Sequence, residues 1–221
     1  MQITSKKILI YILGMFILAA GLTLNTKVTL GVSPILSVPY AVSEIFSLNF
    51  GNVVFFWYCL FIVLELLIHY FIVKEKDRSV YLSDVLQILV SLVFTRIMNL
   101  YGVLIPTFEN LDSPFLSSLI FRLLMLCLAL VLTAIGAALT LNMHLVPNPG
   151  DGIVAAMAQA LHKKVGTSKN IVDISCVAFT VCFSCLLARK IVGVGIGTLI
   201  AMLGVGRIIN FINAHFDFSR F

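Results

Sequence analysis

Two short motifs predict helices that begin within apolar surroundings. The N-terminus of such a helix can bind a ligand. The motifs lie at residues 33–34 and 148–152, and each follows a break in an apolar segment. A helix start presents free N–H groups and partial positive charge, which attract anions and dipolar groups. The alternative is a plain helix cap, with Ser33 and Asp151 satisfying the end donors. The residues that we predict to bind a ligand here are Ser33, Pro34, Asn148, Asp151 and Gly152.

Three further polar residues lie in or beside apolar stretches. Glu44 and Gln159 stand at the far ends of the two short segments that these motifs open. We predict that both contact the ligand; the alternative is that they reach water at the interface. Glu65 lies deeper, one helical turn before His69 on the same face. A carboxyl in a membrane is costly unless it is paired or protonated, so Glu65 would suit a proton-coupled step. The alternative is a carboxyl that burial keeps neutral.

A charged motif occurs twice near the ends of two other apolar segments. Arg96 and Asn99 recur as Arg207 and Asn210, at an interval of 111 residues (207 − 96). A guanidinium fork can form a gating ion pair or bind an anion, so we predict gating or coupling roles for these four residues. The alternative is that both arginines extend to the membrane interface. The sequence contains no zinc pattern, phosphate-binding loop or nucleophile–His–Asp set. We therefore expect no enzyme, no metal and no cofactor.

The composition is that of a membrane protein. Hydrophobic residues make up 60% of the 221 residues and charged residues only 11%. A soluble domain has roughly half apolar and about a quarter charged residues. The lipid bilayer is therefore the expected surrounding. The net charge of +5 does not indicate a nucleic-acid partner, because the basic residues mostly flank apolar segments, as membrane topology requires.

Segment lengths predict an all-α integral membrane protein with six transmembrane helices and two short broken or re-entrant helices. The short segments are 34–47 and 150–161, and Pro39 interrupts the first of them. A span needs about 20 residues, so neither short segment can cross alone. The alternative, in which both cross, gives eight spans. The six predicted spans are 8–24, 53–73, 80–104, 115–145, 170–188 and 191–211.

The chain also reads as two copies of one unit within a single membrane domain, 1–221. An interval of 115 residues pairs Gly21 with Gly136 and Pro34 with Pro149. We take the copies to be 8–101 and 115–213, joined by an acidic link at 105–114. Three spans per copy would invert the second copy and leave both termini on one side. The basic residues that flank the spans place that side in the cytoplasm. The eight-span alternative would instead make the copies parallel.

Several short motifs along the chain are similar to those of a known family. They are Gly21, Leu30–Pro34, Pro149–Ile153, Gly195–Thr198, Ala201 and Gly204. In these residues the chain resembles the YitT/YczE/YyaS family of bacterial integral membrane proteins. Leu36 stands where related members tend to carry an acidic residue, which leaves Asp151 as the only such carboxylate. The resemblance implies a multi-pass protein of the bacterial plasma membrane and a candidate transporter, and it implies no particular substrate.

Three functions remain open at this point. A small-solute secondary transporter or exporter, with a central site between the copies, accounts for the repeats and the intramembrane polar residues. A substrate-binding membrane subunit of a vitamin uptake complex would share the size but would need no repeat. A non-transporting membrane regulator would leave the intramembrane charges without a purpose. We favour transport of an unidentified small molecule, by a chain that could also form a homo-oligomer.

Overall fold

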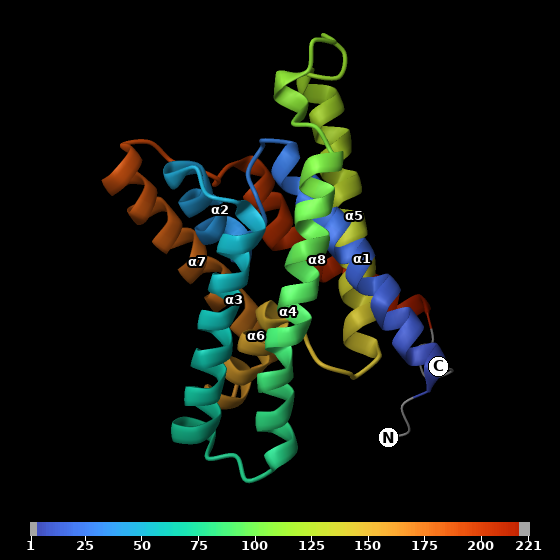
Figure 1. Ribbon diagram of the computed structural model, residues 1–221, viewed down its shortest axis with the longest axis vertical. Coiled ribbons are helices and arrows are strands. Elements are labelled where there is room, and N and C mark those ends of the chain that lie inside the picture. The colour runs from blue at the N-terminus through green and yellow to red at the C-terminus, as the bar shows by residue number, and fades with distance from the viewer. Residues whose placement is uncertain (1–3, 217–221) are drawn as a thin grey trace.

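The computed structural model describes residues 4–216, and in that part the only regular elements are helices (Figure 1). Short loops join the helices, apart from the segment 105–118, which holds a 3₁₀ turn. In chain order the elements are α1 (Ser5–Lys27), α2 (Pro34–Phe46), α3 (Phe50–Leu67) with its π-helical continuation η1 (Ile68–Val73), α4 (Arg78–Leu104), the 3₁₀ turn η2 (Phe108–Asn110), α5 (Leu119–Asn142), α6 (Pro149–Ala160), α7 (Val165–Ala188) and α8 (Ile196–His215).

Among residues 4–216, six helices are long and apolar enough to cross a membrane, as predicted. They are α1, α3 with η1, α4, α5, α7 and α8. The helices α2 and α6 have 13 and 12 residues. At about 1.5 Å per residue they reach only ~20 Å, against a hydrocarbon core of ~30 Å. The protein is therefore a multi-pass membrane protein with two additional short helices.

Several predicted boundaries were wrong by a few residues. The last span begins at Ile196 rather than at residue 191, because Gly193 has φ +79°, which an α-helix does not accommodate. The span predicted to begin at residue 170 begins at Val165. The span predicted as 115–145 is the shorter helix Leu119–Asn142.

The backbone recurs along the chain at an interval of 115 residues. The helices α2 and α6 begin at Pro34 and Pro149, and α3 and α7 begin at Phe50 and Val165. Left-handed backbone at a non-glycine residue is uncommon. In the part of the chain that the structure describes, the six such residues form three pairs at this interval: Thr29 with His144, Ser47 with His162, and Lys74 with Arg189. The corresponding helices therefore end in the same backbone conformation.

The longest packing interface joins α1 to α5, which run in opposite directions (Figure 1). Two glycines allow their backbones to approach closely. A Cβ atom at Gly21 would lie 2.5 Å from the Thr133 nitrogen, and one at Gly136 would overlap the Leu18 backbone. Moving Gly21 and Leu18 along the chain by 115 residues gives Gly136 and Thr133. The same contact is therefore made twice, with the roles of the two helices exchanged.

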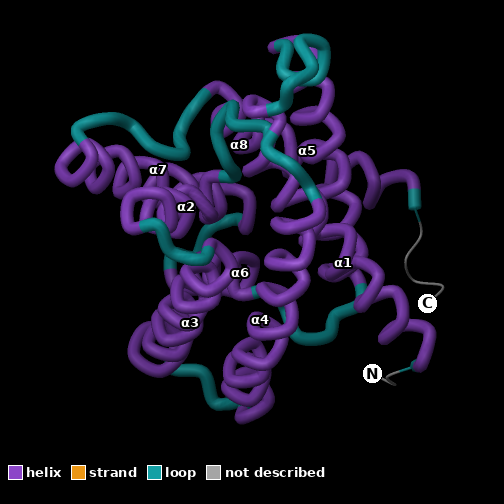
Figure 2. Tube along the Cα trace, turned by 45° about the horizontal axis from the view of Figure 1, so that its top comes forward, coloured by secondary structure: helices purple, strands orange, loops and turns teal. Residues whose placement is uncertain are grey.

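The other helix contacts recur in the same way, with one exception. α2 packs on α7 as α3 packs on α6, and α1 packs on α4 as α5 packs on α8. The short helix α6 lies among α3, α4 and α7 (Figure 2). The exception is that α3 and α4 pack closely while α7 and α8 barely touch. α8 is consequently the most exposed of the six long helices.

A glycine-rich joint holds α8 to the loop that precedes α2. The Val32 N–H donates to the Gly193 carbonyl at 2.9 Å, and the Gly197 N–H donates to the Leu30 carbonyl at 2.7 Å. Gly31 has φ +108°, and a Cβ there would lie 2.6 Å from the Gly195 nitrogen. The two loops can approach this closely because glycine lacks a side chain.

Candidate functional site

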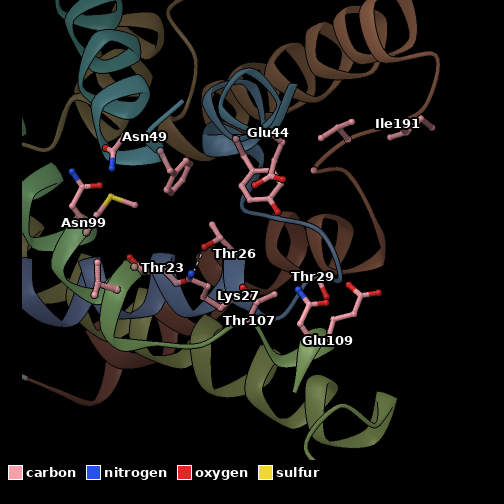
Figure 3. Close-up of a pocket in the computed structure, with 18 of the residues that line it drawn as sticks. Thr23, Thr26, Lys27, Thr29, Glu44, Asn49, Asn99, Thr107, Glu109 and Ile191 are labelled. Carbon is pink, nitrogen blue, oxygen red and sulfur yellow. Dashed lines mark hydrogen bonds between the residues drawn. The ribbon is translucent and has the colours of Figure 1, made fainter. Parts of the chain in front are cut away.

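A wide cavity of about 880 Å³ opens where α1, α2 and α4 end and α3 begins (Figure 3). We call it the wide cavity. Of the predicted site residues it contains Glu44, from α2, and Asn99, from α4. Charged side chains of both signs line it, with Lys27 and Lys190 facing the same space as Glu44 and Glu109. A solute entering here would therefore meet both positive and negative groups.

Arg122 fastens the rim of the wide cavity. Its Nε donates to the Val28 carbonyl at 2.9 Å, and its Nη2 donates to the Thr29 carbonyl at 3.1 Å and also bonds the Thr29 hydroxyl. The same Nη2 lies 3.8 Å from Glu109 Oε2. The end of α1 and the segment that carries Glu109 are thereby tied to α5. Sequence spacing gave no sign of this, because the partners are backbone carbonyls about 90 residues away.

A second, narrow cavity of about 260 Å³ lies at the opposite ends of α3 and α4. It is lined by Glu65, His69, Asp84, Gln87, Gly152 and Gln159, among others. On α4, Gln87 lines the narrow cavity and Met98 lines the wide one. Their 11-residue separation corresponds to about 16 Å along the helix axis. The two cavities therefore lie at different depths of the same helical framework.

Glu65 is the most deeply buried carboxyl of the narrow cavity, with 1% of its surface exposed. Gln87 Nε2 donates to Glu65 Oε2 at 2.7 Å, while Glu65 Oε1 has no hydrogen-bond partner. His69 Nδ1 lies 2.7 Å from Asp84 Oδ2. The histidine is thus already paired, and Glu65 depends on a single donor.

The start of α6 meets Glu65 directly. A Cβ atom at Gly152 would lie 2.5 Å from Glu65 Oε1. The helix is capped by Asn148, whose Oδ1 accepts from the Gly150 N–H at 3.1 Å. Ser33 makes no side-chain cap bond at the start of α2, and Asp151 lies in the first turn of α6. Neither Ser33 nor Asp151 therefore supplies the side-chain cap that the alternative requires: Asn148 caps α6, and Ser33, although it is the N-cap residue of α2, makes no side-chain bond there.

The equivalent contact, between α2 and α7, is built differently. Ser37 and Thr180, which stand 115 residues from Gly152 and Glu65, share a hydrogen bond of 2.7 Å between their hydroxyls. Both are fully buried. Two small hydroxyls thus satisfy each other where α2 meets α7, whereas a glycine and a carboxyl occupy the same place where α6 meets α3.

The repeated arginine and asparagine residues lie in different settings. Arg96 is exposed and donates to Asn52 Oδ1 at 2.5 Å, and Asn99 Oδ1 accepts from the Gly51 N–H at 3.2 Å. Arg207 and Asn210 lie on an exposed face of α8 and line neither cavity. Gln159 is exposed at the narrow cavity, and Pro34 is buried at the start of α2. The structure therefore places Arg96 and Asn99 against the first turn of α3. It places Arg207 and Asn210 away from both cavities.

A separate, half-buried ion pair lies on α7, which packs against α6. Lys169 Nζ lies 2.8 Å from Asp173 Oδ2, and Asp173 is fully buried with its Oδ1 unpartnered. The spacing of four residues predicts this pair on any helix. Asp151 is close enough for electrostatic interaction with both residues. Among residues 4–216, no group of three or more His, Cys, Asp or Glu side chains is placed to hold a metal ion.

The comparison with known proteins identifies one family. Residues 5–214 match DUF6198, a family of unknown function. No curated protein and no solved structure matches the chain. The resemblance to the YitT/YczE/YyaS family stays a prediction. Because the match covers nearly the whole chain, the protein belongs to the DUF6198 family.

Proposed function

We propose that this protein is a secondary transporter for a small polar solute, which enters through one cavity and leaves through the other. The observation that carries the proposal is the equivalence of the two cavities. Tyr40 and Glu44 line the wide cavity, and the residues 115 positions later, Ala155 and Gln159, line the narrow one. Equivalent positions of α2 and α6 thus line the two cavities, which lie at opposite ends of α3 and α4. This arrangement suits alternating access in a transporter built from repeats.

An inverted repeat is the second part of the proposal. Support comes from the helix starts and left-handed residues that recur at 115 residues, and from the opposite directions of α1 and α5. The exchanged contacts at Gly21 and Gly136 also favour a two-fold relation. In such proteins one repeat moves against the other around a fixed site. Which of the two cavities is open to water would then depend on which packing of the two halves is adopted.

The lining of the wide cavity favours a solute with charges of both signs. Lys27 and Lys190 could bind an anionic group, and Glu44 and Glu109 a cationic one. Tyr40 and Phe50 add an aromatic pair with ring centroids 5.9 Å apart. A volume of 880 Å³ lies within the ~300–1,000 Å³ typical of small-molecule sites. Zwitterionic metabolites such as amino acids are therefore the first class to test.

We place the narrow cavity on the cytoplasmic side of a bacterial plasma membrane. The basic residues Lys74, Lys76 and Arg78 lie in and next to the loop at that end of α3 and α4. Loops rich in Lys and Arg remain on the inner side of the membrane. Both termini would then also be cytoplasmic, since six spans separate them.

A thermal-shift screen on the purified protein tests the proposed function. Panels of zwitterions, organic anions and organic cations are compared, because a ligand that binds only the folded protein raises its melting temperature. We expect zwitterions to stabilise the wild type. Glu44→Gln should weaken binding about ten- to a hundredfold, the cost of roughly 1.5–3 kcal/mol for a lost charged contact. Glu75→Gln, in the exposed loop outside both cavities, is the matched control and should bind normally. Stabilisation that survives unchanged in Glu44→Gln would exclude the wide cavity as the site.

A further inference from the structure

We propose that Glu65 is a proton-binding site that couples solute movement to proton movement, with Gly152 providing the space for its carboxyl group. This inference rests on the proposed transport function and adds the coupling ion. The proton would arrive from water in the narrow cavity, bind Glu65 Oε1 as a carboxylic acid O–H, and return to water on release. No other bond is made or broken.

The first argument is the lack of a compensating charge. Glu65 is 1% exposed, its Oε1 has no partner, and its Oε2 accepts one hydrogen bond from the neutral Gln87 amide. An unpaired carboxylate in this setting is strongly destabilised, because a buried charge needs a counter-charge or several donors. Protonation removes the charge and turns the unpartnered oxygen into a donor.

The second argument comes from the titratable groups that face Glu65. The helix α4 contributes Asp84, α6 contributes Asp151, and η1 contributes His69. Asp84 and Asp151 are both acids, and their charges act on Glu65. The remaining packed helix, α2, carries Tyr40 and Glu44 towards its far end. Among the described residues that line the narrow cavity, His69 is the one basic group, and it already bonds Asp84. The surroundings thus favour uptake of a cation at Glu65.

The third argument concerns which cation binds. A metal ion of the alkali or alkaline-earth groups needs several oxygen ligands, for example six to eight for calcium. Around Glu65 the structure gives two unpartnered side-chain oxygens, Glu65 Oε1 and Gln87 Oε1. In the described residues, no group of three or more His, Cys, Asp or Glu side chains is placed to hold a metal ion. A proton requires only one carboxyl oxygen, so the proton is the cation that this site fits.

The fourth argument is the difference between two equivalent contacts, each of which joins one copy to the other. Where α2 meets α7, Ser37 and Thr180 bond each other and carry no ionisable group. Where α6 meets α3, Gly152 stands in place of the serine and leaves room for the longer Glu65 side chain, whose Oε1 a Cβ would approach to 2.5 Å. The pair Gly152 and Glu65 is therefore a chemically distinct version of a structural contact. The carboxyl is not required for the packing itself, because a hydroxyl pair serves at the other position.

Infrared difference spectroscopy tests proton binding without any knowledge of the solute. The protein is reconstituted in lipid nanodiscs, and spectra in acidic and alkaline buffer are subtracted to reveal the C=O stretch of protonated carboxyls. We expect a buried-carboxyl band in the wild type that is lost in Glu65→Gln. The band should also be lost in the double variant Glu65→Thr with Gly152→Ser, which copies the Ser37–Thr180 pair and keeps the fold. Glu75→Gln, in the loop between η1 and α4 and outside both cavities, should retain the band. A band that persists in both Glu65 variants would overturn the proposal.

Two further measurements separate this inference from the transport function. Raising the sodium concentration at fixed pH should leave the melting temperature unchanged; sodium-dependent stabilisation lost in Glu65→Gln would replace the proton by sodium. In proteoliposomes with a trapped pH dye, the stabilising solute from the thermal-shift screen should move protons in the wild type only. Solute uptake that is equal in the wild type and the double variant, with no proton movement in either, would refute coupling while leaving transport intact. Absence of any solute uptake, with the infrared band present, would refute transport while leaving the proton site intact.

Discussion

Gly152 and Glu65 compete for the same space, since a Cβ on residue 152 would lie 2.5 Å from Glu65 Oε1. The carboxyl can occupy its position beside α6 because residue 152 has no side chain. Their equivalents, Ser37 and Thr180, fill the corresponding space with two bonded hydroxyls. The size of the side chain at position 152 therefore determines whether a carboxyl fits at position 65.

Gly152→Ala should displace the Glu65 carboxyl from Gln87 without unfolding the protein. The clashing atoms are the end of a flexible side chain, so the chain can move away at low cost. We expect a melting temperature within a few degrees of the wild type and a shifted carboxyl band in the infrared difference spectrum. An unchanged band would show that Gly152 does not position Glu65.

Gly136→Ala should behave differently and destabilise the protein. A Cβ there overlaps the backbone of Leu18, which cannot move without separating α1 from α5. Overpacking of this kind costs about 1–3 kcal/mol. Gly206→Ala is the control, because no atom lies within 4 Å of its Cβ. The control should melt at or above the wild-type temperature, since alanine favours a helix by ~1 kcal/mol over glycine. Equal melting of both variants would contradict the close α1–α5 contact.

Lys169→Met should be destabilising, because it leaves the fully buried Asp173 without its charge partner. Removing one member of a fully buried ion pair costs about 3–5 kcal/mol, and the cost here should be lower because 34% of the Lys169 side chain is exposed. The double variant Lys169→Met with Asp173→Asn should recover much of the lost stability, as it removes both charges. Chemical denaturation in detergent gives the comparison. A double variant no more stable than the single one would show that the charge of Asp173 is not the cause.

The topology has its own test in single cysteines at Lys76 and Asp112, in a background where the five native cysteines are replaced. These residues lie in the loop between η1 and α4 and in the segment between α4 and α5. We expect a membrane-impermeant reagent to label residue 112 from outside and to leave residue 76 protected in intact cells. The reverse pattern would exclude the proposed orientation, and labelling of both from one side would exclude six spans.

The sequence predicts the helical framework well because it depends on local demands. Pro34 and Pro149 each begin a helix, because proline is accommodated in a first turn but not in the interior of a helix. Long runs of apolar residues define the spans. The interval of 115 residues also pairs the starts of α2 and α6. The break in the helix at Gly193 could not be predicted, because its positive φ allows a hydrogen bond with the distant loop that precedes α2. Local sequence does not contain that contact.

The candidate site could be predicted only in part. The depth of Glu65 in an apolar segment marked it, but its partners Gln87 and Gly152 come from α4 and α6. Helix rotation and neighbours decide such contacts, and one sequence does not specify them. Arg207 and Asn210 repeat the motif at Arg96 and Asn99, yet α8 separates from α7 where α4 packs on α3. Most equivalent residues are 115 positions apart, whereas Arg96 and Arg207 are 111 apart. This change of interval is the one feature of the sequence that indicates a different placement of α8.

The central claim is that the two cavities give access to opposite sides of the membrane, and labelling at equivalent positions tests it most directly. Glu44→Cys and Gln159→Cys, each in the cysteine-free background, are exposed to impermeant reagent in cells and in inside-out vesicles. Both native side chains are exposed at their cavities, so both cysteines should react. The account predicts that residue 44 reacts in cells and residue 159 in inside-out vesicles, and that a bound solute changes the two rates in opposite directions. Reaction of both residues from the same side would contradict it.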